Sequence, residues 1–477
     1  MDATDAVFRK PLEAALKHAL EYLENLDHSP VDVTVSLECL RNRLGKPLAV
    51  EGLTPERVIE DLLRDAEGGI VGSAGGRFFA WVVGGALPAS LAADWLTAVW
   101  DQNAGIYASG PAAAVVEEVA GNWLKDIFGL PKEASFALVT GAQMAHVTCL
   151  AAARHEVLSK KGWDVEQQGL SGAPKVRILA TKERHGTCDR AIRLLGFGLK
   201  NTDRIDVDER GRIQIESLEQ ALAADPSAPA IVLLQAGDVN IGAYDLFTQA
   251  IPIAHHYGAW VHVDGAIGLW AAASPRFKHL VAGVQEADSW TTDGHKWLNT
   301  PYDCGYAFVA HPEAHRGSMS HRESYLIHDT DARDQIDWNP EWSRRARGFA
   351  TYAALRQLGR QGVGDLVERC CRLAHALVTR IGALPGAEVV WEPVINQGLV
   401  RFLDPSPNAS EEDHDRRTDA VIAAIVKTGE AYFGGTTWRG RRAMRVSVSN
   451  WRTSDADVDR VVAAVVRVMG PQSAVAY

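Results

Sequence analysis

Short, mostly apolar runs that alternate with helical patterns constrain the fold of this chain more than any other feature. Five runs of four to six residues lie between residues 86 and 362: Phe136–Val139, Val176–Ala180, Ala230–Leu234, Ala259–Val263 and Gly305–Ala310. Such runs are typical of parallel strands buried on both faces. One of the helical patterns between them starts at a predicted capping box, Ser217–Gln220. The pattern predicts an α/β fold with a mainly parallel central sheet and helices on both faces.

Two further segments flank this predicted large domain of residues 86–362. Residues 1–85 form an N-terminal helical segment, with helical spacing over Pro11–Leu26 and a second helix opened by Thr54 and Pro55. This segment is short and amphipathic, so we expect it to pack on a partner subunit. Residues 363–477 predict a small α+β domain, in which a helix over Gln357–Ile381 leads to three strands and a closing helix: Glu388–Trp391, Leu399–Leu403, Met444–Ser449 and Val458–Val468.

Composition excludes several functions. The chain has 60 acidic and 49 basic residues, which argues against binding to nucleic acid or an anionic membrane. No apolar run approaches the ~18 residues of a membrane span, and no signal peptide is recognisable. The six cysteines include no C-x-x-C pair, so a zinc site of paired thiolates is not expected and no metal is predicted. We therefore expect a cytoplasmic protein with free thiols.

The stretch Val261–Cys304 carries the clearest chemical signal. Asp264 ends a predicted buried strand, and an acid at the carboxyl end of such a strand points into the crevice where parallel sheets bind ligands. Lys296 follows about thirty residues later, between a histidine and a tryptophan. A partly desolvated lysine releases its proton more readily, and its neutral amine can attack a carbonyl. The alternative is a surface lysine on a turn, which the upstream aspartate disfavours.

The motif His295-Lys296-Trp297, followed by Leu298–Gly305, resembles the group II pyridoxal-phosphate-dependent decarboxylases, which act on glutamate, histidine and aromatic amino acids. The resemblance runs from Arg77–Trp81 to Met444–Ser449 and covers nearly the whole chain. It implies the fold of fold-type I enzymes, pyridoxal 5'-phosphate as cofactor, and an L-amino acid as substrate. It also implies a homodimer with its active site at the subunit interface.

The resemblance implies a role for each matching residue. Lys296 would carry the cofactor covalently, Asp264 would hold its protonated ring nitrogen, and His185 would stack on its ring. The remaining matches are phosphate contacts and residues along the ring edge: Gly141, Ala142, Gln143, His295, Asn240 and Ala266. Relatives often carry Thr or Ser where Gln143 stands and Glu where Met144 stands, so a hydroxyl contact to the phosphate is not expected here. Some relatives also have Thr at the position of Asn240.

Tyr325 falls where the family has a catalytic tyrosine on a loop of the neighbouring subunit, twenty-nine residues after Lys296. In the family this tyrosine returns a proton to Cα after the carboxylate has left. The polar surroundings, from His321 to Asp334, predict an exposed loop. Relatives with phenylalanine at this position tend to make aldehydes, so Tyr325 favours simple decarboxylation. The alternative role of Tyr325 is packing within the loop.

The substrate is less clearly encoded than the cofactor. Phe79 and Trp81 match positions that line the side-chain pocket of aromatic decarboxylases, with Val82, Trp100 and Tyr107 as further candidates. An aromatic amino acid is therefore favoured, although the same residues also suit a core. Alternatives on the same scaffold are an acidic or diamino-acid decarboxylase, an aldehyde synthase or a carbon–carbon lyase. An acidic substrate would need an arginine, for which Arg344, Arg345 and Arg347 are candidates. A scaffold without catalysis is disfavoured by the complete set of Lys296, Asp264 and His185.

Overall fold

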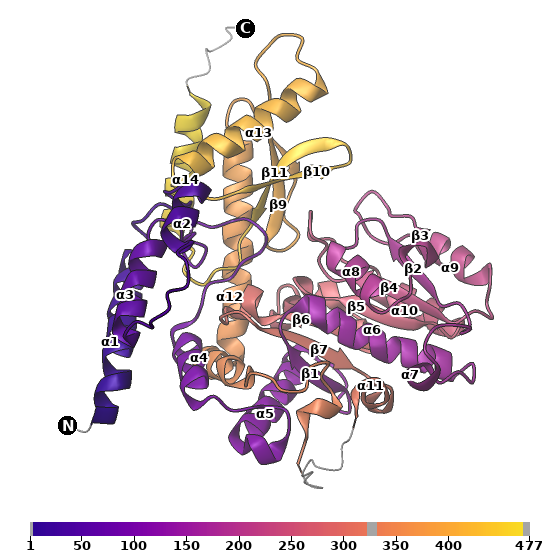
Figure 1. Ribbon diagram of the computed structural model, residues 1–477. Helices are drawn as coiled ribbons and strands as arrows, with labels where there is room; N and C mark the ends of the chain where they lie inside the picture. Colours follow the sequence, from indigo (N-terminus) through magenta and orange to yellow (C-terminus); the bar gives the residue numbers. More distant parts are fainter. Residues whose placement is uncertain (1–2, 322–331, 471–477) are drawn as a thin grey trace.

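A seven-stranded sheet forms the centre of the molecule (Figure 1). The computed structural model describes residues 3–321 and 332–470. The strands lie in the order β1-β7-β6-β5-β4-β2-β3. Their bounds are β1 (Ser135–Val139), β2 (Arg177–Thr181), β3 (Thr202–Ile205), β4 (Ala230–Gln235), β5 (Trp260–Asp264), β6 (Ser289–Asp293) and β7 (Gly305–Val309). The predicted fold class is confirmed, and each of the five predicted runs overlaps a strand.

The direction of β7 corrects one expectation. β7 pairs antiparallel with both β1 and β6, whereas every other pair in this sheet is parallel. The segment between β6 and β7 is too short for the crossover helix that a parallel connection needs. The sequence did not reveal this because a strand buried on both faces reads as an apolar run in either direction.

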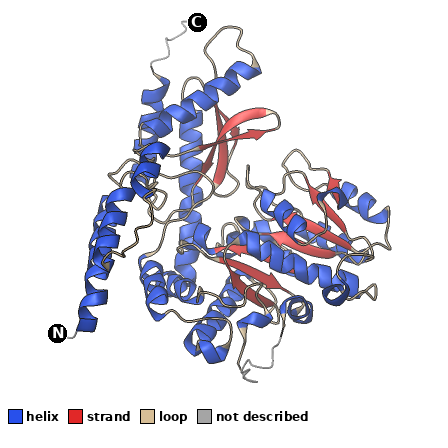
Figure 2. Ribbon diagram, in the orientation of Figure 1, coloured by secondary structure: helices blue, strands red, loops and turns tan. Residues whose placement is uncertain are grey.

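Helices cover both faces of the sheet, as Figure 2 shows. Alternate residues of each strand enter different cores: Phe136 and Leu138 face one side of β1, and Ala137 and Val139 face the other. The helices of this part are α4 (Pro88–Trp100), α5 (Pro111–Phe128), α6 (Ala142–Ser159), α7 (Val165–Gln168), α8 (Gly186–Leu194), α9 (Ile215–Ala223), α10 (Phe247–His256), α11 (Pro312–Met319) and α12 (Gly348–Gly382). The predicted capping box is wrong. α9 begins at Ile215, and the Ser217 hydroxyl instead accepts a hydrogen bond from the Asp206 amide at 3.3 Å.

The C-terminal part contains a smaller antiparallel sheet in the order β10-β11-β9-β8. Its elements are β8 (Ala387–Trp391), β9 (Gln397–Phe402), α13 (Glu411–Lys427), β10 (Gly434–Trp438), β11 (Arg441–Ser447) and α14 (Asp455–Met469). The predicted boundary at residue 362 falls inside α12, near Gly359, where the backbone leaves helical geometry (φ 64°). The three-part division of the chain stays a prediction.

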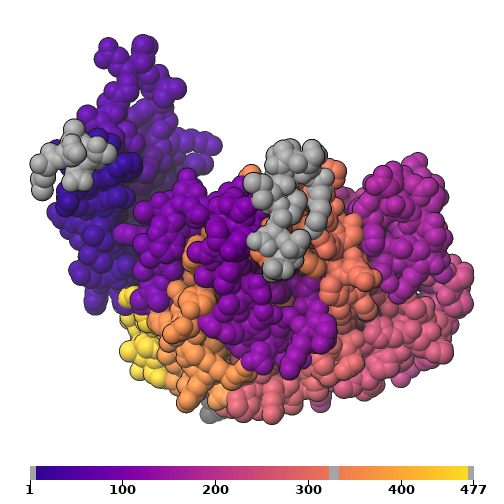
Figure 3. Space-filling view, turned by 90° about the horizontal axis from the view of Figure 1, so that it is seen from below, coloured from indigo at the N-terminus to yellow at the C-terminus, as the bar shows by residue number. Residues whose placement is uncertain are grey.

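The N-terminal helices are α1 (Ala3–Asn25), α2 (Leu37–Leu44) and α3 (Pro55–Ala66), and they gather at one end of the molecule (Figure 3). Thr54 caps α3 as predicted, accepting from the Arg57 amide. The sequence predicts that residues 1–85 pack on a partner subunit. Residues 77–79, however, pack on the C-terminal part of the same chain, where the Phe79 amide donates to the Tyr432 carbonyl. No helix among residues 3–321 and 332–470 is long and apolar enough to cross a membrane.

Asn299 ties three distant segments together. Its side-chain oxygen accepts from the amides of Gly85 (2.7 Å) and Trp451 (3.0 Å), and its nitrogen donates to the carbonyls of Trp297 and Ser449. All of this side chain is buried, and its backbone is left-handed (φ 52°). The residue thus joins the segment that follows Lys296 to the loop before α4 and to the C-terminal part.

We predict that Asn299→Ala lowers the free energy of unfolding by roughly 3–5 kcal/mol, because two buried amides lose their acceptor and alanine disfavours a left-handed backbone. Denaturant unfolding of the cofactor-free protein measures this loss. Asn299→Gly is the matched control, because glycine adopts the backbone without strain but also removes the hydrogen bonds. A glycine variant as stable as the wild type would show that the side chain ties nothing together.

Candidate active site

The carboxyl ends of β1, β4, β5 and β6 meet at one edge of the large sheet and form one wall of a cavity of 410 Å³. Three of these strands end in a polar residue that lines the cavity: Gln235, Asp264 and Asp293. The opposite wall includes Trp81 from the loop before α4 and Arg445 from β11 of the small sheet. The cavity therefore lies between the two sheets, where ligands of open α/β sheets bind.

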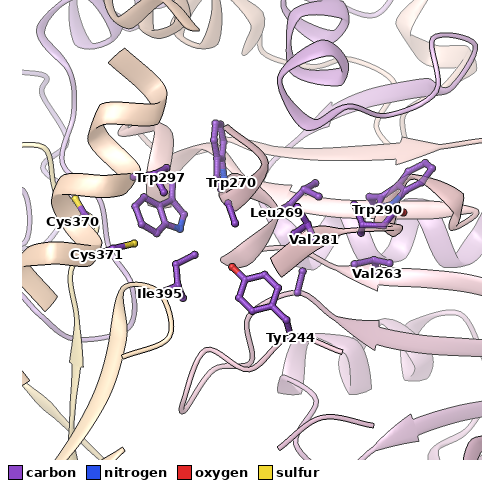
Figure 4. Packing of buried hydrophobic residues seen from close by; sticks show 14 of the residues in the cluster. Tyr244, Val263, Leu269, Trp270, Val281, Trp290, Trp297, Cys370, Cys371 and Ile395 are labelled. Atoms are coloured by element: carbon purple, nitrogen blue, oxygen red, sulfur yellow. The ribbon is translucent and has the colours of Figure 1, made fainter. Parts of the chain in front are cut away.

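Lys296 lies in a π-helical turn, Gly294–Leu298, between β6 and β7. Its side chain is 16% exposed, and its Nζ lies 3.2 Å from an Asp293 carboxylate oxygen. The adjacent Trp297 is buried beside Cys370 and Cys371 of α12, as Figure 4 shows, and anchors the turn in the core. Turns of this rare type are frequent at functional sites. Lys296 is a cavity residue and not a surface lysine.

Asp264, the last residue of β5, has a side chain that is only 13% exposed, and its neighbours favour the ionised form. The Ala266 amide donates to its Oδ1 (3.1 Å), and His146 Nε2 lies 3.5 Å from its Oδ2. Burial alone would raise the pKa of Asp264, but the positive charge and hydrogen bond of His146 outweigh it and hold this pKa well below its usual range. The strand end thus presents a permanent anion to the cavity, and Ala266 lies beside it in the wall.

His185 caps the N-terminus of α8 and lines the cavity. Its Nδ1 accepts from the Thr187 amide (3.2 Å) and lies 2.7 Å from the Thr187 hydroxyl, so two contacts fix the ring plane. Burial lowers the pKa of His185, which favours the neutral ring at neutral pH. A fixed, uncharged aromatic ring is suited to stacking on a flat ligand.

Gly141, Ala142 and Gln143 form the N-terminus of α6, which has 18 residues and follows β1. Both side-chain amide atoms of Gln143 are buried and have no hydrogen-bond partner among the described residues. A Cβ on Gly305 would lie 2.4 Å from Gly141, so glycine is needed where β7 begins beneath this turn. Unpaired buried polar atoms at the positive end of a helix are suited to hold an anion such as phosphate.

His295 lies next to the N-terminus of α6, in the cavity wall. Its Nδ1–H donates to the Cys304 carbonyl (3.0 Å), and its ring stacks on Tyr302. Burial lowers the pKa of His295, so the ring is neutral at neutral pH. With Nδ1 as the donor, Nε2 is left as an acceptor that would meet a phosphate only by way of a phosphate proton or a water.

Four predicted site residues lie outside the cavity wall: Phe79, Asn240 and the two further pocket candidates Trp100 and Tyr107. Phe79 is fully buried (0% exposed) and stacks on Phe433, so it belongs to the core. Its ring points inward because residues 77–79 pack closely on the C-terminal part. Asn240 accepts a hydrogen bond from the Thr436 hydroxyl of β10 (2.7 Å), and it joins the two sheets instead of lining the cavity. Tyr325 lies outside the described residues.

Several cavity residues were missed by sequence reasoning. Asp293 ends β6 just as Asp264 ends β5, and this parallel was a usable signal. Arg445 reaches the cavity from β11, more than a hundred residues away in the sequence, and nothing local marks it. Its guanidinium donates to the Val239 carbonyl (2.9 Å), and burial lowers its pKa. His146 was also missed; it lies behind Asp264 and outside the cavity wall, and α6 contains other polar residues, such as Thr148 and His155, from which nothing local sets it apart.

Together these groups fit pyridoxal phosphate. The cavity offers an amine for its aldehyde, an anion for its ring nitrogen, a flat ring for its face and a helix N-terminus for its phosphate. Cavities of 300–1,000 Å³ are typical of small-molecule sites. The fold and the site define an enzyme of the pyridoxal-phosphate fold-type I class.

Comparison with known proteins specifies the family. The family profile described as "pyridoxal-dependent decarboxylase conserved domain" matches residues 41–403. An aromatic-L-amino-acid decarboxylase of Bacillus atrophaeus is 24% identical over 465 residues, which are 96% of this chain and 94% of the relative. A phenylacetaldehyde synthase of Petunia hybrida is also 24% identical, over 95% of this chain and 92% of its own. The crystal structure of Oryza sativa TDC with PLP and tryptamine superposes with a TM-score of 0.90 at 23% identity, covering 98% of this chain and 99% of that one.

The chain belongs to the family of pyridoxal-dependent decarboxylases. The family resemblance seen in the sequence is confirmed, and with it the fold, the pyridoxal phosphate cofactor and the class of enzyme, a carboxy-lyase acting on amino acids. The individual roles of the site residues stay predictions.

Proposed function

We propose that the protein decarboxylates an aromatic L-amino acid, giving the amine and carbon dioxide. The observation that carries this proposal is the wall opposite Lys296, where a buried guanidinium and an exposed indole, Arg445 and Trp81, face the same cavity. These two groups match the two ends of an aromatic amino acid, its carboxylate and its ring.

The cofactor would be held by groups on four segments. Lys296 would bind its aldehyde covalently, Asp264 its ring nitrogen and His185 its ring face, with Gly141, Ala142 and Gln143 at its phosphate. When bound, pyridoxal phosphate supplies an electron sink for the electrons of the bond to the departing carboxylate. Asp293 would orient Lys296 through the 3.2 Å contact and fasten the lysine turn to α6 by accepting from the Ala142 amide.

Arg445 would bind the α-carboxylate of the substrate. Its guanidinium is largely buried and donates to the neutral Val239 carbonyl; Asp238 acts on its charge, but no carboxylate of the described residues lies within ion-pair distance. A planar guanidinium binds a carboxylate with two parallel hydrogen bonds and so fixes its plane. By fixing that plane, Arg445 would orient the bond that has to break relative to the cofactor ring.

Trp81 would contact the substrate side chain. The indole is 60% exposed and lies against Phe78 and Tyr432, with ring centroids 5.7 and 5.5 Å away. Its backbone is left-handed (φ 54°), and so is that of Val82, which also lines the cavity. An aromatic cluster at the cavity favours an aromatic substrate over an acidic one.

The three arginines considered for an acidic substrate have other partners. Arg344 is buried against Glu117 (2.7 Å), Arg345 binds Asp94 (2.8 Å), and Arg347 lies 3.6 Å from Glu341. None of these arginines belongs to the cavity wall in the described part of the chain. The acidic-substrate alternative therefore loses the cations on which it depended.

An aldehyde synthase is the second candidate, favoured by the name of the Petunia relative. Amine formation requires a proton to be delivered to Cα after decarboxylation, whereas aldehyde formation requires oxygen to react instead. Tyr325 is the proposed proton donor, which favours the amine.

We predict that the holoenzyme releases carbon dioxide from L-tryptophan, L-tyrosine or L-DOPA at least 10-fold faster, in kcat/KM, than from L-glutamate or L-2,4-diaminobutyrate. The chemical reason is the aromatic cluster at Trp81 together with the absence of a cation for a second carboxylate in the described wall. Carbon dioxide release with mass analysis of the organic product measures both rate and identity. Aldehyde with peroxide would identify a synthase, and preferential turnover of glutamate would contradict the proposed substrate.

Trp81 supplies a matched pair of control variants for this experiment. Trp81→Ala should raise KM for the aromatic substrate roughly 2- to 10-fold, the worth of one aromatic contact, whereas Trp81→Phe should retain most of the affinity. Equal KM values in both variants and the wild type would place the substrate ring elsewhere.

The proposed functional unit is a homodimer. α1 and α4 border an apolar groove of 870 Å³, lined by Phe8, Leu12, Leu16, Trp95, Leu96 and Val99. Phe8 is 68% exposed, and the other five are also exposed. An exposed apolar patch of this kind marks a protein interface, and an isologous contact with a second copy would cover it. An active site shared between subunits, with Tyr325 given by the partner, is part of this proposal.

We predict that sedimentation equilibrium gives a dimer and that Leu12→Glu together with Leu16→Glu shifts it toward monomer, because two charges would be buried in the apolar contact. Lys17→Glu on the same helix is the control, since Lys17 is highly exposed and its charge reversal leaves the apolar face intact. A wild-type monomer, or a dimer unaffected by the leucine changes, would contradict this interface.

The proposed compartment is the cytoplasm. All six cysteines are free thiols, and five of them are buried. Free thiols in this number suit a reducing compartment.

A further inference from the structure

A path of polar contacts runs from the cavity into the core behind Asp264: an ion-pair contact between Asp264 and His146, followed by hydrogen bonds deeper in the core. His146 of α6 lies with Nε2 at 3.5 Å from Asp264 Oδ2, and its Nδ1 is 2.9 Å from His262 Nε2. His262 Nδ1 in turn lies 2.9 Å from the Ser289 hydroxyl, which accepts from the Trp260 indole N–H (2.9 Å). His146, His262 and Ser289 are fully buried. One helix, α6, and two strands, β5 and β6, thus contribute to one continuous polar path through an apolar core.

The Trp260 indole, at the far end of this path, suggests the direction in which hydrogen bonds are donated along it. An indole N–H only donates, so Ser289 accepts from Trp260 and can pass its own proton on to His262 Nδ1. His262 then donates from Nε2 to His146 Nδ1, and His146 donates from Nε2 to Asp264. If His146 instead carries both protons, it donates to His262 and to Asp264 at once. In both arrangements the group that faces Asp264 is an N–H donor.

The charges of the neighbouring groups agree with this geometry. Burial alone would lower the pKa of His146, but Cys188 and the carboxylate of Asp264 together raise it well above its usual range. Burial lowers the pKa of His262, so His262 is neutral. Cys188 lies 3.7 Å from both His146 Nε2 and Asp264 Oδ2, and burial raises its pKa, which keeps it a neutral thiol. On the cavity side, Asp264 faces His185, whose ring is neutral, and Lys296 lies in the same wall.

We propose that His146 is a positioning residue for the cofactor: by donating from Nε2 it keeps Asp264 an anion, so that the proton shared with the cofactor's ring nitrogen stays on the ring. His262 and Ser289 hold the His146 ring in the orientation that makes this donation. The proposal rests on the proposed role of Asp264. Without the donor, a buried carboxylate would take up the proton itself and leave the ring nitrogen neutral.

Two other uses of the same residues compete with this one. His146 could serve as packing alone, in which case only its shape would matter. His146, Cys188 and Asp264 also place one ligand atom each within 4.8 Å of one another, a set that a metal ion could use. The donor role differs from both because it depends on one ring nitrogen and needs no ion.

Two substitutions of His146 separate the nitrogen atoms. Glutamine carries its amide nitrogen near the position of Nε2, so His146→Gln retains a donor to Asp264. Asparagine carries its nitrogen near the position of Nδ1, so His146→Asn retains the contact with His262 and loses the donor. The holoenzymes are loaded with ¹⁵N1-labelled pyridoxal phosphate, and the ¹⁵N chemical shift at neutral pH reports whether the ring nitrogen is protonated.

The wild type and His146→Gln should give the shift of a protonated ring. In His146→Asn the ratio of protonated to unprotonated ring should fall about 10-fold, as expected for loss of one hydrogen bond to a charged group. The cofactor dissociation constant should rise by a similar factor. Cys188→Ala removes the weak thiol donor to the same carboxylate and should change the ratio less than His146→Asn does. Equal shifts in both His146 variants, whether normal or altered, would overturn the proposal, and so would a shift that responds to chelation of metal ions.

Asp264→Asn distinguishes a failure of the proposed role of Asp264 from a failure of the proposed role of His146. If its ring nitrogen keeps the wild-type shift, the proposed role of Asp264 fails and this inference fails with it. If the shift responds to Asp264→Asn but not to His146→Asn, only the role of His146 is overturned. Neutron diffraction of the wild-type holoenzyme tests the same point if a variant does not fold. It should show deuterium on His146 Nε2 and none on Asp264, whereas deuterium on an Asp264 oxygen would overturn the proposal.

Discussion

The site depends on the burial of two carboxylates, Asp264 and Asp293, at the ends of neighbouring strands. A buried anion is costly unless it is paired and hydrogen-bonded, so each carboxylate requires its own partners. Asp293 has the Ala142 amide and Lys296, which brings the lysine turn and the N-terminus of α6 to one place. Asp264 has His146 and the Ala266 amide. The positions of the amine and of the helix N-terminus thus follow from the partners that Asp293 requires, and the position of His146 follows from those that Asp264 requires.

Local patterns in the sequence were sufficient to predict most of the fold. Strands buried on both faces read as apolar runs, and the Thr54–Pro55 signal correctly marked the start of α3. The direction of β7 escaped prediction because a strand buried on both faces reads as an apolar run in either direction. The true start of α9 escaped it because the Ser217 hydroxyl contacts the Asp206 amide, outside the helix, instead of capping it.

The candidate site likewise contains residues that local patterns predicted and residues that they did not. Asp264, Lys296, His185 and the Gly141–Gln143 turn were found because each follows a strand or starts a helix, and all of them lie in the cavity wall. Arg445 and His146 were missed because their importance comes from what faces them across the fold. Phe79 and Trp81 lie two residues apart, but Trp81 lines the cavity whereas Phe79 is buried in the core, and the predicted substrate contact of Phe79 stays a prediction.

The central claim is that Lys296 holds pyridoxal phosphate in this cavity, and it can be tested without knowing the substrate. Borohydride reduction of the holoenzyme converts the covalent link between lysine and cofactor into a stable secondary amine, and peptide mapping then locates the pyridoxyl group. We predict a single modified peptide containing Lys296, and no modification in Lys296→Arg treated in the same way. A pyridoxyl group on any other lysine of the wild type would contradict the account.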